Sequence, residues 1–216
     1  MSGRSRIVLV TVGVIALAGA AAATLAKVLD DDGPAAKVTE VGAQGPTSPF
    51  KGALRPAGAS AGDFALRDQD GRLVRLSRLR GKVVVLSPMY TTCRDTCPLV
   101  AQQIQDALLD LPAADRAQVR ALALSVDPRN DTPDSARKFL RARLVSHDLD
   151  FLLGSQAELR PVWQTFGFSP QTDDREHNSY VVLIDKHGDQ RVGFPVDYLT
   201  PESLAHDVRL LVRERA

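Results

Sequence analysis

Two cysteines, the only two in the chain, stand four positions apart at Cys93 and Cys97. They belong to the segment 90–98, Y-T-T-C-R-D-T-C-P, which follows an apolar run and precedes an amphipathic stretch. The i, i+4 spacing puts two side chains on one face of a helix, and Pro98 suits a helix start because it has no N–H to leave unpaired. We therefore expect both sulfurs at a first helical turn, where the positive end of the helix dipole favours thiolate over thiol.

Two neighbouring thiolates support metal binding or redox chemistry. Soft thiolates suit Cu(I), and an added imidazole also allows Cu(II). Thioredoxin-type dithiols have two residues between the cysteines, whereas three separate them here, which leaves the sulfurs able to act as separate ligands. A plain disulfide or a pair of buried thiols is the alternative. A structural zinc site is disfavoured because it needs four ligands and the chain supplies two cysteines.

Four histidines are candidates for a third ligand. His177 ends a polar stretch that leads into an apolar run, and by itself it is typical of a solvated loop side chain. His187 falls in a turn, and His206 lies on a helix among charged residues. His147 lies near a helix end, where a cation is mildly favoured. The residues alone therefore do not select the ligand.

Composition indicates an ordinary globular protein. The chain has 216 residues, of which 44% are apolar and 25% charged, and its formal net charge is +1. Lys and Arg are scattered along the chain and form no basic stripe, which excludes DNA and RNA as partners.

The N-terminus has the pattern of an export segment. Arg4 and Arg6 precede an uncharged apolar run over residues 7–26, and Lys27 and three aspartates follow it. Twenty apolar residues match the thickness of a bilayer core, and this charge order places the rest of the chain on the extracytoplasmic side. We expect residues 1–27 to be a membrane anchor. A cleaved signal peptide and a buried helix of a soluble domain are the alternatives.

Residues 28–62, rich in Ala, Gly, Pro and Ser, are expected to form a flexible linker to a domain over residues 63–216. In that domain the pattern predicts strands that alternate with helices. Strands are expected over 64–66, 73–76, 83–86, 119–126, 151–153, 180–184 and 190–194, and helices over 98–111, 133–144, 156–166 and 201–213. Such an order predicts an α/β, thioredoxin-like fold with an N-terminal β-hairpin extension.

The cysteine motif and three other segments resemble the Sco (SenC) family of copper-binding, thioredoxin-fold proteins. Segment 90–98 is similar to the family's Y-T-x-C-x-x-x-C-P, and segment 125–133, S-V-D-P-R-N-D-T-P, is similar to its S-V-D-P-x-x-D-T-P. D-Q-D-G at 68–71 and L-R-G-K at 79–82 resemble the lead-in to its first central strand. His177 stands at the spacing where the family has its copper-ligating histidine.

This resemblance implies a copper site made of Cys93, Cys97 and His177. Asp127 ends an expected central strand near the same edge of the sheet, so it is a candidate second-shell group or weak ligand, with a simple turn residue before Pro128 as the alternative. It also implies a metallochaperone that delivers Cu(I) or Cu(II) to the dinuclear copper centre of cytochrome c oxidase. The partner would be the copper-bearing subunit of the oxidase or another copper chaperone. The main alternative is a thiol–disulfide oxidoreductase that reduces the partner's cysteines, with Cys93 attacking and Cys97 resolving. A copper-responsive redox sensor would use the same residues.

Overall fold

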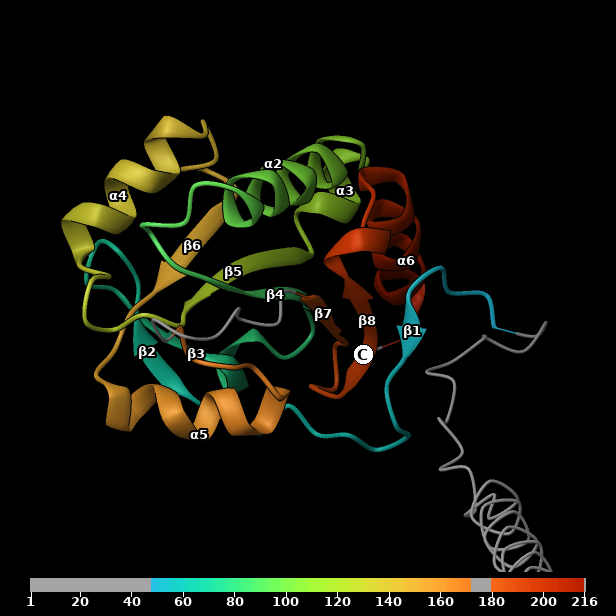
Figure 1. Cartoon of the computed structure of the whole chain (residues 1–216). Coiled ribbons are helices and arrows are strands. Elements are labelled where there is room, and N and C mark those ends of the chain that lie inside the picture. Colours follow the sequence, from blue (N-terminus) through green and yellow to red (C-terminus); the bar gives the residue numbers. More distant parts are fainter. Residues whose placement is uncertain (1–47, 172–179, 216) are drawn as a thin grey trace, which may run out of the picture. The chain divides into compact units, whose positions relative to one another are not determined.

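The computed structural model describes residues 48–171 and 180–215, and its centre is a six-stranded sheet of order β1-β8-β7-β4-β5-β6 (Figure 1). The strands are β1 (Ala53–Leu54), β4 (Val83–Met89), β5 (Val119–Ser125), β6 (Leu149–Leu152), β7 (Tyr180–Ile184) and β8 (Gln190–Pro195). Strands β4, β5 and β6 run parallel, whereas β7, β8 and β1 add antiparallel pairs. The predicted α/β order of strands and helices is thereby confirmed.

Helices cover both faces of this sheet (Figure 1). They are α2 (Thr96–Leu109), α3 (Ala113–Arg116), α4 (Pro133–Ala142), α5 (Gln156–Phe166) and α6 (Pro201–Arg213), with 3-10 turns η1 (Leu76–Leu79) and η2 (Val196–Tyr198). Successive residues of β4 point to opposite faces. Val83 and Val85 pack in the core that contains α2, α4 and α6, whereas Val84 and Leu86 pack in the core that contains α5. Burial on both faces explains why this strand is a continuous apolar run.

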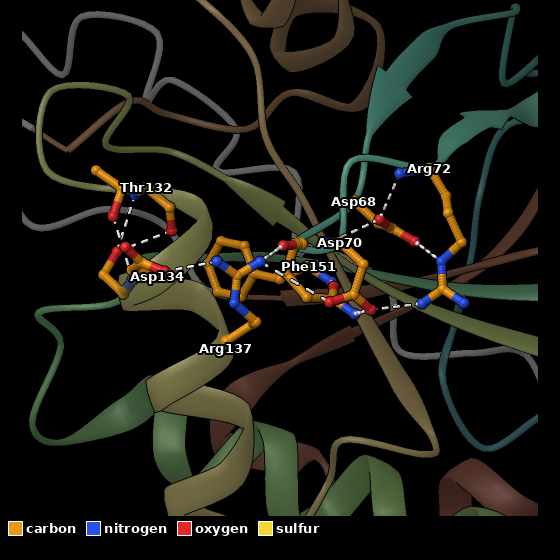
Figure 2. A network of polar contacts seen from close by, with 9 residues as sticks. Asp68, Asp70, Arg72, Thr132, Asp134, Arg137 and Phe151 are labelled. Atoms are coloured by element: carbon orange, nitrogen blue, oxygen red, sulfur yellow. Dashed lines mark hydrogen bonds and ion pairs between the residues drawn. The ribbon is translucent and has the colours of Figure 1, made fainter.

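The N-terminal hairpin forms a separate two-stranded sheet of β2 (Ala65–Arg67) and β3 (Leu73–Arg75), as predicted. Its turn contains Gly71 at a φ of 78°, a conformation that glycine adopts without steric cost. Arg137 of α4 donates to the backbone carbonyl of Gln69 in this turn. Figure 2 shows that Arg137 also pairs with Asp134 on its own helix. The side-chain carbonyl of Gln69 accepts the backbone N–H of Phe151 in β6 at 2.7 Å. This network fixes the hairpin against α4 and β6.

Helix α4 begins where the Thr-Pro pair predicts. Thr132 is the N-cap, and its Oγ1 accepts the backbone N–H of Ser135 at 3.1 Å, while Ser135 Oγ accepts the N–H of Thr132 at 2.8 Å. Pro133 occupies the first helical position, where a missing N–H costs nothing. This reciprocal cap fixes the start of α4 beside the cysteine loop.

Part of the segment expected to be a linker belongs to the compact domain. Phe50 and Ala61 are buried in the two cores, and β1 pairs with β8. The buried carboxylate of Asp207 on α6 accepts the backbone N–H groups of Lys51 at 2.8 Å and Gly52 at 2.9 Å. Residues 50–62 are therefore held to the sheet, although their composition gives no strand or helix pattern.

The expected membrane anchor, residues 1–27, lies outside the described part of the chain. Within residues 48–171 and 180–215, no helix is long and apolar enough to cross a bilayer.

Candidate metal centre

Both cysteines lie where β4 passes into α2. Cys93 stands in the loop after β4, and Cys97 is the second residue of α2. Neither cysteine forms a disulfide, and the exposed fraction is 7% for Cys93 and 2% for Cys97. The carboxyl end of a parallel strand followed by a helix is the usual position of sites in open α/β sheets. The two cysteines are neighbours, as predicted, but only Cys97 lies in the first turn of α2, because the helix begins at Thr96 and Cys93 lies in the loop before it.

Several donors converge on the Cys93 sulfur. The Cys97 thiol hydrogen-bonds it, the backbone N–H of Cys97 donates to it at 3.2 Å, and the Asp95 N–H and the Tyr90 hydroxyl also donate. Each of these bonds is stronger to a thiolate than to a thiol. Together they lower the pKa of Cys93 to about 5, against the opposing effect of burial.

Cys97 has the opposite protonation preference. Its thiol donates the proton in the bond to Cys93, and this donation together with burial raises the pKa of Cys97. Cys93 is therefore the thiolate of the metal-free pair, and Cys97 is the thiol. Such a pair offers one ready soft ligand and a second that becomes a ligand on losing its proton.

A buried carboxylate positions the loop ahead of the cysteines. Asp131 accepts the backbone N–H of Thr91 at 2.7 Å and the hydroxyl of Ser125, at the end of β5, at 2.6 Å. The Thr91 hydroxyl bonds the hydroxyl of Ser135 in α4 at 3.0 Å. Burial raises the pKa of Asp131. The loop is thereby fixed to β5 and α4 by contacts between residues distant in sequence.

Asp127 lies at the same edge of the sheet, as predicted. It is 3% exposed, and its Oδ2 accepts the side-chain amide of Asn130 at 2.7 Å. Its Oδ1 is buried and has no hydrogen-bond partner among the described residues. A buried carboxylate oxygen of this kind is costly unless a donor reaches it.

His177 lies outside the described residues, but the ends of its segment are defined. The backbone N–H of Gln171 donates to the carbonyl of Val126 at 2.8 Å, next to Asp127. On the other side the chain resumes at Tyr180, the first residue of β7. Among residues 48–171 and 180–215, no cluster of three His, Cys, Asp or Glu side chains could hold a metal.

The remaining candidates lie elsewhere. His187 is exposed in the β7–β8 turn, and His206 bonds Asp207 on α6 at 2.9 Å. His147 lies near the start of β6, at the opposite end of the parallel strands from the cysteine loop.

Two groups of the site, Tyr90 and Asp131, were not predicted from the sequence. Both stand inside the segments 90–98 and 125–133, but their roles depend on contacts that spacing does not reveal. The position of Asp131, just before an N-cap threonine, was the one available signal.

Comparison with known proteins places the chain in a known family. The family model described as SCO1/SenC matches residues 52–213. The SCO1 protein homolog of Bacillus subtilis is 37% identical over 98 residues, which are 44% of this chain and 50% of that protein. The chain thus spans about half the length of this relative.

Two solved structures share the fold over nearly their full length. The copper-bound ScoI of Bradyrhizobium japonicum is 30% identical, with a TM-score of 0.59 over 69% of this chain and 98% of that one. BsSco, described as a member of the Sco family of cytochrome c oxidase assembly proteins with a disulfide switch, is 28% identical. Its TM-score is 0.63 over 72% of this chain and 95% of that one. These structures confirm the thioredoxin-like fold.

Proposed function

The chain belongs to the SCO1/SenC family, and from this premise we propose that it is a copper metallochaperone for cytochrome c oxidase. It delivers copper to the dinuclear copper centre during assembly of the oxidase. Cys93, Cys97 and His177 hold the metal. Copper bound to one structural relative and the oxidase-assembly description of another support this proposal.

The pair of sulfurs is the observation that carries the proposal. Cys93 and Cys97 lie within hydrogen-bonding contact of each other, and Cys93 is held as a thiolate in the loop just before α2. Two soft donors at that separation suit copper in its Cu(I) state, and an imidazole extends the site to Cu(II).

Chain connectivity supports His177 as the third ligand. In the β4–β7 pairing Leu86 stands opposite Val182, so Tyr180 lies toward the end of β4 that leads to the cysteines. Three residues of extended chain span at most about 10 Å, and this limits how far His177 lies from Tyr180. The position of Tyr180 at this end of the sheet supports the assignment of His177 as the third ligand.

The Asp127 carboxylate is suited to orient the imidazole of His177. Histidine ligands usually donate their second ring N–H to a carboxylate or carbonyl, which fixes the tautomer. The buried Oδ1 of Asp127 lacks a partner among the described residues. It fits the role of acceptor for His177 in the loaded protein.

A site with three protein ligands has an open position for the acceptor. Copper is released by ligand exchange, in which thiolates of the partner bind the copper before Cys93 and Cys97 dissociate from it. Oxidation of the pair to a disulfide removes both sulfur ligands, so the redox state of the pair gates loading.

Location follows from the N-terminus. We infer that residues 1–27 anchor the chain in the membrane and that the copper domain faces the extracytoplasmic side. The partner is then the copper-bearing subunit of the oxidase, or another copper chaperone in that compartment.

The test is copper binding by the reduced full-length chain and by His177→Ala, with His187→Ala as the matched control. We expect one copper per chain in the wild type and in the control, and a loss of affinity of at least about tenfold in His177→Ala. Binding indifferent to His177 would refute the ligand assignment.

The asymmetry of the thiols favours one second candidate, a thiol–disulfide oxidoreductase. Its attacking thiolate would be Cys93, whose pKa is lowered, and its resolving thiol would be Cys97, whose pKa is raised. Reduction of a disulfide in a model peptide should then persist in His177→Ala. Loss of copper binding without loss of reductase activity would separate the two roles.

A further inference from the structure

Tyr90 contacts both sulfurs of the pair. Its hydroxyl donates to the Cys93 sulfur, and its backbone N–H donates to the Cys97 sulfur. Its backbone carbonyl accepts the N–H of Cys93 at 3.2 Å, which closes the turn after β4. One residue thus touches each sulfur from the side of the sheet.

The Tyr90 ring is fixed before any metal binds. It follows directly on β4 and packs against the cores on both faces of the sheet. A half-buried ring held between two packed cores has few rotamers available. Packing consequently directs the Tyr90 hydroxyl at the Cys93 sulfur. The side chain therefore loses little conformational freedom when copper binds.

We propose that Tyr90 is a positioning residue of the metal centre, whose hydroxyl hydrogen-bonds the Cys93 ligand and thereby favours Cu(I) over Cu(II). This inference rests on the proposed function and adds to it a residue that sets the preferred oxidation state of the cargo. Tyr90 itself does not bind the metal.

The physical reason lies in the electrons of the sulfur. A donor hydrogen bond draws on the same lone pairs that the thiolate gives to copper, and so weakens the sulfur–metal bond. This weakening is larger for Cu(II) than for Cu(I), because the more highly charged ion depends more on electron donation from the thiolate. Hydrogen bonding around a cysteine ligand is a known means by which proteins tune copper potentials.

Tyr90→Phe isolates the hydroxyl, since it keeps the ring and its packing. Tyr198→Phe is the matched control, because Tyr198 is 77% exposed on η2. The experiment loads the full-length chain and both variants with Cu(II) and records the sulfur-to-copper charge-transfer absorption. It then measures the Cu(II)/Cu(I) reduction potential with a redox mediator that supplies the electron.

We expect Tyr90→Phe to shift the charge-transfer band to longer wavelength and to raise the affinity for Cu(II) relative to Cu(I) by about tenfold. For a one-electron couple, that ratio lowers the reduction potential by about 59 mV. Tyr198→Phe should match the wild type in both measurements. Unfolding in urea should remain cooperative and show only the small loss expected for one removed hydrogen bond, because the ring and its packing are kept.

The outcomes separate this inference from the function on which it rests. Copper bound normally, with a band and a potential that Tyr90→Phe leaves unchanged, would overturn the inference and leave the function intact. Failure of the wild type and both variants to bind copper would overturn both. A shift of equal size in Tyr198→Phe would also refute the specific role of Tyr90.

Discussion

The protonation of the cysteine pair predicts an unusual pH profile for alkylation of the reduced, metal-free chain. With a pKa of about 5, Cys93 is almost fully thiolate at neutral pH, whereas an ordinary cysteine is about 3% thiolate there. Its intrinsic nucleophilicity is lower, because reactivity falls with pKa at a Brønsted slope of about 0.4–0.5. Over a drop of about 3.5 pKa units, the gain in thiolate fraction is about 30-fold and the loss of nucleophilicity is about 25- to 56-fold, so the two factors nearly cancel.

The dependence of the alkylation rate on pH, and not the absolute rate, therefore identifies Cys93 as the thiolate. Between about pH 6.5 and pH 9 the rate for Cys93 should change less than about twofold, whereas an ordinary thiol rises roughly 80-fold. Cys97 should stay unreactive over the same range, because its proton is held in the bond to Cys93 and it is buried.

The chain offers a direct assay. Trypsin cleaves after Arg94 and so separates Cys93, in peptide 83–94, from Cys97, in peptide 95–116. Iodoacetamide pulses at each pH, followed by mass spectrometry, give the two rates in one sample. A rate for Cys93 that climbs steeply with pH, or earlier labelling of Cys97, would refute the assignment of Cys93 as the thiolate.

Two stability predictions follow from buried carboxylates. Asp131→Ala leaves the Thr91 N–H and the Ser125 hydroxyl without their acceptor, and should lower the free energy of unfolding by about 1–3 kcal/mol in urea titrations. Asp131→Asn keeps an acceptor and should recover part of that loss; no difference between the two would argue against the contact with Thr91. Asp207→Ala should release the backbone N–H groups at the start of β1 and increase their hydrogen exchange while β4 stays protected. Unchanged exchange at β1 would contradict the anchoring role of Asp207.

Local chemistry was readable from the sequence wherever neighbouring residues decide it. Thr132 and Pro133 specify a helix start by their own side chains, and α4 begins there. Residues 83–86 are apolar without alternation because both faces of β4 are covered, and the strand is buried throughout. The short spacing of Cys93 and Cys97 likewise keeps the two residues together where the loop after β4 enters α2, although only Cys97 lies in the helix.

Only the tertiary structure decided which sulfur carries the charge and where the domain begins. Asp131 reaches Thr91 across 40 positions of sequence, and Asp207 reaches Lys51 across 156. Neither contact has a local pattern, since each exists only after distant elements have packed. Residues 50–61 resemble a linker in composition, yet Phe50 and Ala61 fill the two cores. Burial and hydrogen bonding at these positions are properties of the assembled fold, because they depend on which distant groups exclude water from them.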